Sequence, residues 1–443
     1  MNFDIDALLR QYVTHGIVGN PHRHVGLELE YPLIPLKGDA VDLDVLRGLF
    51  PVLAGIGFDQ QRFSSSGLPL RATDADGNTV TFDTCYGVLE YVTTHVPSMQ
   101  PLYRRYREAI ALIQRYLTDN GHMLIGMGIN PYASRMKQTM LESELTMVIG
   151  EFFKYEASIA MSPRAKYLDF YCDIASEQVH FNTTPEELPA LFCAFTYVDF
   201  ANILLFSNSP AQLDGAQYRC GRIKLYTDSV FNDMGVVGSQ MRDPQTLDDI
   251  VRSYRKLCLF TRHRDGRAEI FPPTPIEDYF TDPQCAARPE DIFDFDLERN
   301  IVTTSYGTVE YRLNCTQPFS NAFVPSAFNL GLRTLLGETL ELSRKLYGDL
   351  DLKDPNQVND CAARGFVEGL SPERRERHLR ALLDIAQRGL KARGYGEEAF
   401  LLPLLKRPAI DHSPAEGFLH DARTLGLDQA ILLRGALGDS LID

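Results

Sequence analysis

The sequence predicts an α+β protein built on one β-sheet, with a mainly helical segment at the C-terminal end. Up to about residue 320, short stretches alternate apolar and polar residues with the period of a strand, and helical patterns stand between them. From Ser326 onward the pattern is mainly helical, and no repeat or low-complexity linker separates the two regions. We therefore expect a sheet-bearing domain over residues 1–325 and a helical segment over 326–443 that packs on it.

Composition narrows the class of protein. The 443-residue chain carries 44 Lys and Arg against 59 Asp and Glu, a formal net charge of −15, and 44% of its residues are hydrophobic. This hydrophobic content predicts a folded chain. The acidic balance, without a Lys/Arg-rich stripe, argues against a nucleic-acid partner. The first residues lack a secretory or transit signal and no Cys-x-x-Cys pair occurs, so we expect a cytoplasmic protein with free thiols.

The first region alternates strands with helices. The expected strands cover residues 24–33, 79–82, 88–94, 178–182 and 308–313. Helical patterns cover 102–119 and 186–206, the second with Thr184 as N-cap, and both would lie on one face of the sheet. The window 190–206 is short for a membrane span and contains Asp199, so we expect a buried helix and no membrane association.

Residues typical of helix starts, helix ends and turns predict the remaining elements. In the C-terminal region, Ser371 opens a charged helix that ends at Gly394. Segments 64–78 and 227–247 are rich in Gly and Asp and predict mobile loops of the kind that flank a site. The sequence pattern does not indicate a role for segment 135–170.

Three of the expected strands carry polar side chains that can bind ligands or protons on one face. Residues at i and i+2 of a strand point to the same side. The residues that share this pattern are Glu28 and Glu30, then Gln178, His180 and Asn182, then Glu310 and Arg312. For the first motif alone, a solvated strand face is the alternative. If the strands are neighbours, several acids converge with one histidine.

A further pair of acids stands at Asp83 and Glu90. Their odd spacing prevents them from sharing a face of one unbroken strand, but Gly87 offers a place for a bend that would bring them together. The alternative is an unrelated loop Asp and strand-edge Glu.

Clustered carboxylates require either raised pKa values or divalent cations. An oxygen-rich set with one histidine suits two or three Mg²⁺ or Mn²⁺ ions, whereas zinc would favour more His or Cys. Such ions together with Arg312 suggest phosphoryl transfer. No Walker A sequence occurs, so ATP would be held by the metal-lined sheet.

Taken together, these residues resemble the glutamate-cysteine ligase superfamily, including its plant-type branch. The resemblance rests on six pieces over about residues 24–320: Gly26–Glu30, Asp83 with Glu90, Val179–Asn182, Asn208–Pro210 with Gly215, Arg222–Asp228, and Val309–Arg312 with Pro318 and Phe319. It implies a curved, largely antiparallel sheet of the glutamine synthetase or guanido kinase type. The domain over 1–325 would then be the catalytic one.

The resemblance also implies residue roles. Six residues resemble metal ligands: Glu28, Asp83 and Glu90 at one ion, and Glu30, His180 and Glu310 at a second. Four resemble substrate- or nucleotide-binding residues: Gln178, Asn182, Arg222 and Tyr226. Arg312 resembles the residue that faces the transferred phosphoryl group, with Glu310 beside it in the catalytic set. Surface ion pairs are the alternative for the two arginines.

The activity implied is that of an ATP-dependent ligase, a monomer or homodimer, that joins glutamate and cysteine through an acyl phosphate, the first step of glutathione biosynthesis. The chain departs from the plant-type branch at Tyr226, where Trp is usual, and over 135–170, which leaves the acceptor open. The alternatives are a ligase of a specialised pathway for another acid or amine, a phosphotransferase, and a non-catalytic nucleotide- or metal-binding relative. The retained acidic set argues against the last.

Overall fold

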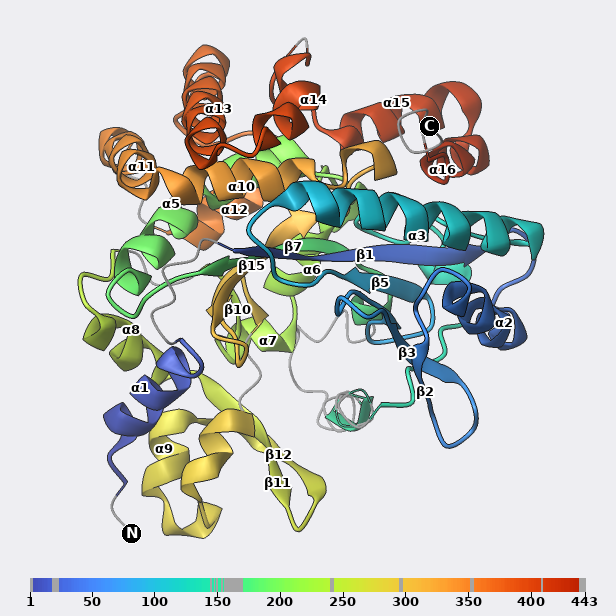
Figure 1. The fold of residues 1–443 in the computed structure, drawn as a ribbon. Coiled ribbons are helices and arrows are strands. Elements are labelled where there is room, and N and C mark those ends of the chain that lie inside the picture. The colour runs from blue at the N-terminus through green and yellow to red at the C-terminus, as the bar shows by residue number, and fades with distance from the viewer. Residues whose placement is uncertain are drawn as a thin grey trace.

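The computed structural model describes residues 3–17, 24–143, 146, 148, 150–152, 154, 170–239, 243–294, 298–350, 354–407 and 409–437. It confirms the α+β class, with a large antiparallel sheet among helices (Figure 1). Within these residues the sheet has nine strands in the order β14-β15-β7-β1-β5-β4-β3-β2, and β6 pairs with β1. Only part of the unassigned segment 135–170 lies within the described residues.

The sheet contains all five predicted strands. Its members are β1 (Val25–Pro35), β2 (Gln60–Phe63), β3 (Pro69–Thr73), β4 (Thr79–Phe82), β5 (Val88–Val92), β6 (His122–Leu124), β7 (Ser176–Asn182), β14 (Ile301–Thr303) and β15 (Thr308–Cys315). The loop predicted over 64–78 was wrong, because β3 lies within it. Gly67 and Gly77 have φ values of 78° and 93°, so the glycines mark the turns on each side of β3.

Helices α3 (Met99–Asp119), α5 (Leu188–Phe206) and α10 (Val324–Thr334) cover one face of the sheet (Figure 1). The α5 helix is long and apolar enough to cross a membrane, but 94% of its apolar window is buried, as predicted for a core helix. The predicted Thr184 cap was wrong. Residues 185–187 form a turn in which Glu187 N donates to Thr184 O over 3.1 Å, and the helix begins at Leu188.

The C-terminal region is helical, as predicted. It contains α11 (Leu336–Leu350), α12 (Pro355–Ala363), α13 (Pro372–Arg393), α14 (Leu402–Leu405), α15 (Pro414–Leu425) and α16 (Leu427–Arg434). Both predicted ends of α13 are confirmed, because Ser371 Oγ accepts from Arg374 N over 3.3 Å and Gly394 is left-handed. Helices α10 and α13 cross closely, since a Cβ on Gly331 would lie 2.2 Å from Ala386 O. The boundary at residue 325 stays a prediction.

Small elements lie beyond the opposite face of the sheet (Figure 1). They include α6 (Gly221–Thr227), α7 (Val230–Asp233), β10 (Val237–Gly238) and β13 (Glu298–Arg299). The loop predicted over 227–247 was wrong in part, because α7 and β10 fall inside it and β10 pairs in parallel with β13. The other elements are α1 (Ile5–Thr14), α2 (Leu43–Ala54), β8 (Ala211–Leu213), β9 (Ala216–Tyr218), α8 (Leu247–Tyr254), β11 (Cys258–Arg264), β12 (Arg267–Pro275) and α9 (Ile276–Thr281).

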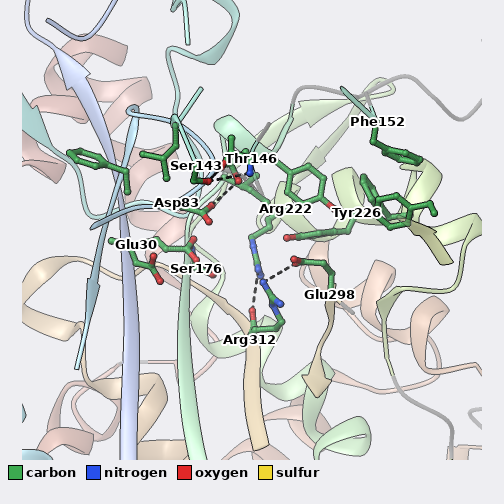
Figure 2. Close-up of a pocket in the computed structure, with 18 residues that line it drawn as sticks. Glu30, Asp83, Ser143, Thr146, Phe152, Ser176, Arg222, Tyr226, Glu298 and Arg312 are labelled. Carbon is green, nitrogen blue, oxygen red and sulfur yellow. Dashed lines mark hydrogen bonds and ion pairs between the residues drawn. The ribbon is translucent and has the colours of Figure 1, made fainter. Parts of the chain in front are cut away.

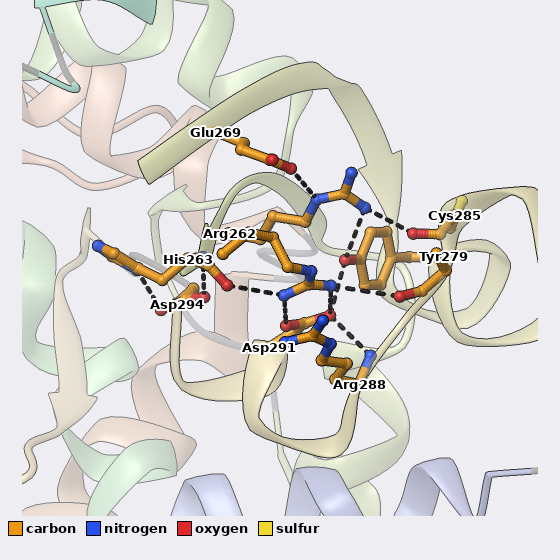
Figure 3. A network of polar contacts seen from close by, with 10 residues as sticks. Arg262, His263, Glu269, Tyr279, Cys285, Arg288, Asp291 and Asp294 are labelled. Carbon is orange, nitrogen blue, oxygen red and sulfur yellow. Dashed lines mark hydrogen bonds and ion pairs between the residues drawn. The ribbon is translucent and has the colours of Figure 1, made fainter. Parts of the chain in front are cut away.

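A polar network ties the β11–β12 hairpin to α9 and the short helical segment Pro289–Asp294 (Figure 3). Its centre is Asp291, which is fully buried. Arg264 donates to both carboxylate oxygens of Asp291 over 2.5 and 2.7 Å, and the hydroxyl of Tyr279 donates over 2.8 Å. Burial opposes ionisation of Asp291, but the Arg264 hydrogen bonds hold its pKa below the usual range. The guanidinium of Arg264 thus balances the negative charge of Asp291.

Candidate active site

The sheet brings the predicted polar residues onto neighbouring strands. Glu30 of β1 lies opposite Glu90 of β5, and Glu28 lies opposite Gln178 of β7. On the next pair of strands, His180 lies opposite Glu310. Residues directly opposite on antiparallel strands have Cβ atoms about 5 Å apart and present their side chains to the same face. The expectation that these strands are neighbours is therefore confirmed.

Glu28 and His180 form an ion pair at the centre of this face. His180 Nε2 lies 2.9 Å from Glu28 Oε1, and His180 Nδ1 lies 3.0 Å from Thr308 Oγ1. Burial opposes ionisation of Glu28, but the charge and hydrogen bond of His180 lower its pKa. Burial likewise opposes the imidazolium, but Glu28 raises the pKa of His180. The two groups stabilise each other's charge.

Glu30 is held by uncharged hydrogen-bond donors. Ser176 donates through its backbone N–H and its hydroxyl over 2.6 and 2.9 Å, and Gln178 Nε2 donates over 2.7 Å. Burial and the nearby charge of Asp83 raise the pKa of Glu30 to about 8. Gln178, predicted to bind substrate or nucleotide, thus contacts Glu30. The grouping of Glu30 with His180 and Glu310 at a second ion stays a prediction.

Asp83 and Glu90 are brought together by a turn between β4 and β5, as the sequence predicted. The turn contains Gly87, and both acids line the same cavity. Burial raises the pKa of Asp83, and the charge of Glu298 adds to the effect. Burial raises the pKa of Glu90 well above its usual value, with a further contribution from the charge of Glu28. Negative charge is therefore costly on this part of the sheet.

Arg312 lies at the edge of this acidic group (Figure 2). Its Nη2 is 2.8 Å from Glu298 Oε2, and its Nε is 3.5 Å from Glu310 Oε1. Burial raises the pKa of Glu310, and Arg312 opposes this effect. Sequence reasoning missed Glu298, because it lies on a two-residue strand that leaves no periodic pattern.

Arg222 and Tyr226 come from α6, which lies against the same site. Arg222 is 3% exposed, and its guanidinium donates to the carbonyls of Leu313 and Arg312 over 2.9 and 3.1 Å. Its Cζ lies 5.1 Å from the ring centroid of Tyr226. Among the described residues no carboxylate pairs with Arg222, and its Nε has no hydrogen-bond partner. A buried cation of this kind suits an anionic ligand.

These residues surround a cavity of about 280 Å³ (Figure 2). The polar lining residues are Glu30, Asp83, Thr84, Glu90, Ser143, Thr146, Ser176, Arg222, Glu298 and Arg312. The apolar and aromatic ones are Phe82, Leu141, Phe152, Tyr171, Ile174, Tyr226, Phe231 and Phe260. The other predicted residues, Glu28, Gln178, His180, Asn182 and Glu310, lie outside this lining. Asn182 Oδ1 accepts from His24 N over 3.1 Å at the end of its strand.

The donor set fits magnesium in its chemistry. Within the part of the chain that the structure describes, no group of three or more His, Cys, Asp or Glu side chains is arranged to hold a metal ion. Mg²⁺ is usually held by one or two carboxylates together with water and substrate phosphates. Glu310 Oε1 is buried without a hydrogen-bond partner, and three cavity carboxylates have raised pKa values. The site therefore suits ions that arrive with a phosphate ligand.

Comparison by sequence finds no matching protein-family model and no matching curated protein. Among solved structures, a glutamate–cysteine ligase from Francisella tularensis in complex with AMP matches with a TM-score of 0.50 and 12% identity, over 96% of this chain and 91% of that one. A bifunctional glutathione synthetase from Pasteurella multocida matches with a TM-score of 0.52 and 12% identity, over 99% of this chain. The match covers 54% of that longer protein, so the chain spans about half of its length. The predicted resemblance is thus confirmed at the level of fold.

Proposed function

We propose that the protein is an ATP-dependent ligase that joins a carboxylic acid to an amine through an acyl phosphate. The observation that carries the proposal is the placement of Arg312, which contacts Glu298 over 2.8 Å, in one cavity with the buried carboxylates of Glu30, Asp83 and Glu90. Divalent ions that bridge phosphate oxygens, together with an arginine that faces the transferred group, stabilise phosphoryl transfer. The shared fold supports the same class of reaction.

In the first step, an oxygen of the substrate carboxylate attacks the γ-phosphorus of ATP, and the bond to the β-γ bridging oxygen breaks. ADP leaves and an acyl phosphate forms. Arg312 donates to the transferred phosphoryl oxygens, and Glu298 holds its guanidinium over a 2.8 Å contact. Arg222 supplies a second buried positive charge, for the substrate carboxylate. Asp83, Glu90 and Glu30 would hold the ions, which supply charge neutralisation for the phosphates.

In the second step, the amine nitrogen attacks the acyl carbon and a C–N bond forms. The bond between the acyl carbon and the phosphate oxygen breaks, its electron pair leaves with inorganic phosphate, and the amine loses a proton to phosphate or solvent. A carboxylate alone is a poor acyl donor, and ATP converts one of its oxygens into a leaving group. The amine attacks in its neutral form, so an acceptor that arrives as an ammonium ion first loses one proton to solvent, and the second proton leaves after the C–N bond has formed.

The substrates proposed first are glutamate and cysteine, which would place the protein at the first step of glutathione biosynthesis. The resemblance to that superfamily is what suggests this pair, and no sequence feature requires a thiol in the acceptor. We further propose that Glu28, His180 and Glu310 complete the ion sites from the adjoining strands, that Asn182 contacts the nucleotide or its ion, and that the sheet is related to the curved sheets of glutamine synthetase and guanido kinases.

The test is ADP release by the purified chain with ATP and Mg²⁺, across a matrix of acids and amines, with mass spectrometry of the products. A product equal in mass to acid plus amine less water, formed only when both are present, is the expected result. Phosphorylated amine without amide would identify a phosphotransferase instead. Absence of ADP from every pair would indicate a non-catalytic relative.

A further inference from the structure

The cavity wall that faces away from the sheet is aromatic. Figure 2 shows Phe152 and Tyr226 on the side of the cavity away from Glu30. The ring centroids of Phe152 and Phe260 are 4.3 Å apart, and those of Phe152 and Phe231 are 5.6 Å apart. These three phenylalanines, with Tyr171 beside Phe231 at 5.2 Å, form what we call the aromatic wall.

The aromatic wall is formed by segments far apart in the sequence. Phe231 comes from α7 and Phe260 from β11, whereas Phe152 lies before β7 in the chain. Phe152, Phe231 and Phe260 are only 0%, 6% and 4% exposed, yet each contributes to the cavity surface. Their ring planes are inclined to one another by 44°, 49° and 72°. The result is a rounded apolar surface rather than a flat slot.

We propose that the aromatic wall is the side-chain subsite for the amine acceptor, and that the acceptor carries an aromatic or bulky apolar group next to its amino group. This inference rests on the proposed ligase function, and it replaces cysteine, the acceptor that the resemblance implies, with a larger one. The amino group of such a molecule would face the sheet side, where the acyl phosphate forms, while its apolar end leaves water and packs against the aromatic lining on the other side. A cysteine side chain is too small to cover the wall.

The chemistry of the cavity lining favours an amine over the adenine ring of ATP as the occupant. Adenine needs hydrogen-bond partners along its edge, as well as a face to stack on. The side chains of Phe152, Phe231 and Phe260 on the aromatic wall offer neither a hydrogen-bond donor nor an acceptor. A cavity of about 280 Å³ is also at the lower limit for drug-sized ligands, which suits an amine of amino-acid size better than a nucleotide.

The experiment uses the full chain with ATP, Mg²⁺ and a panel of amino-acid carboxylates, and compares phenethylamine and phenylalanine with cysteine and 2-aminobutyrate. We expect an aromatic acceptor to exceed cysteine in kcat/KM for ADP release by about tenfold or more. Phe260→Ala and Phe231→Ala should raise the acceptor KM by about tenfold and leave the KM for ATP unchanged. Leucine at either position tests the same point if the alanine variant fails to fold.

The matched control is Phe280→Ala. Phe280 is 3% exposed on α9 and does not line the cavity, so its loss should leave the acceptor KM unchanged. A preference for cysteine with amide formation intact would overturn the aromatic acceptor and leave the ligase standing. A raised KM for ATP alone in the two cavity variants would assign the wall to adenine and also overturn the inference. No ADP from any pair would instead contradict the proposed function.

Discussion

Two of the regions that bury carboxylates treat them in opposite ways. In the hairpin network, Arg264 donates to both oxygens of Asp291, and the pKa of this acid falls below its usual range. On the sheet face, Glu30 receives its hydrogen bonds from the uncharged Ser176 and Gln178, and its pKa rises to about 8. Fold stability explains the first arrangement, because a buried charge needs a partner.

The arrangement on the sheet face destabilises the protein when no ion or substrate is bound. The pKa values of Glu90 and Asp83 are raised, as that of Glu30 is. Glu298, another acid of the cavity, contacts Arg312 over 2.8 Å. A cluster of uncompensated acids in a cavity is a feature of functional sites, since a bound cation can supply the missing charge. In these two regions the acids are all buried, and what distinguishes them is that Asp291 has an arginine partner whereas the cavity group Glu30, Asp83 and Glu90 combines raised pKa values with an open cavity.

The largest expected effect follows from Arg312→Ala. If Arg312 stabilises the transferred phosphoryl group, its loss should lower kcat for ADP release by about 10³-fold or more. The melting temperature should also fall, but by less than in Arg264→Ala, because the side chain of Glu298 is 18% exposed whereas that of Asp291 is 1% exposed. Steady-state ADP release and thermal unfolding measure the two quantities. Activity within about threefold of the starting protein would remove Arg312 from the phosphoryl site.

Arg264→Ala should have the opposite pattern. Its loss leaves Asp291 buried without a cation, which typically costs about 3–5 kcal/mol of unfolding free energy. The kcat per folded molecule should stay unchanged, because the hairpin network lies outside the cavity lining. Urea unfolding and active-fraction assays check both statements. A stable but inactive variant would show that the hairpin network belongs to the site.

The pH dependence of stability should separate the two regions by sign. The raised pKa of Glu30 means that the folded state binds its proton more tightly, so ion-free protein should lose stability as pH rises from about 4.5 to 8. Glu30→Gln should flatten this slope and stabilise the ion-free protein at pH 8 by roughly 1–3 kcal/mol, while abolishing most activity. The lowered pKa of Asp291 acts in the other direction. The contribution of Asp291 to folding stability is full above its pKa in the unfolded state and is lost as the pH falls through its pKa in the folded state.

Chemical denaturation of the ion-free protein at several pH values, with and without Mg²⁺, measures this effect. Mg²⁺ should reduce the loss of folding stability at alkaline pH, because a bound cation neutralises the negative charge of the cavity carboxylates. The control is the same series on the Glu30→Gln variant. A stability that rises steadily from about pH 5 to 8 in both the starting protein and this variant would contradict the assignment of Glu30 as an uncompensated acid.

The smallest effect is expected at the exposed rim of the hairpin network. Glu269 pairs with Arg262 over 2.8 Å, but its side chain is 46% exposed. Exposed pairs of this kind contribute about 0–1 kcal/mol, so Glu269→Ala should change the unfolding free energy by less than Arg264→Ala in the same assay. An equal loss in the two variants would mean that the whole network acts as one cooperative unit.

Sequence alone predicted the part of the fold in which periodicity is strong. The alternation around Glu28, His180 and Glu310 placed three strands with their polar residues on one face, and Ser371 and Gly394 set the limits of α13. Local patterns of this kind extend over several residues, so they survive without knowledge of the tertiary structure.

The remainder depends on contacts between distant segments. Glu298 lies on a strand of two residues, and the aromatic wall joins Phe152, Phe231 and Phe260 from three segments, so neither leaves a local pattern. The start of α5 was placed too early, because a turn at 185–187 follows the same Pro and Glu signals as a helix. The metal and substrate roles of the individual residues stay predictions.

The central claim is that a substrate carboxylate becomes an acyl phosphate on this acidic face. The direct measurement follows the transfer of an oxygen atom from the acid to phosphate. The acid carries ¹⁸O at both carboxylate oxygens and reacts with ATP, Mg²⁺ and the productive amine. Mass spectrometry then measures the ¹⁸O content of the inorganic phosphate formed. The mechanism predicts one ¹⁸O atom in each phosphate released, because the attacking carboxylate oxygen leaves with phosphorus. Unlabelled phosphate alongside amide product would contradict it.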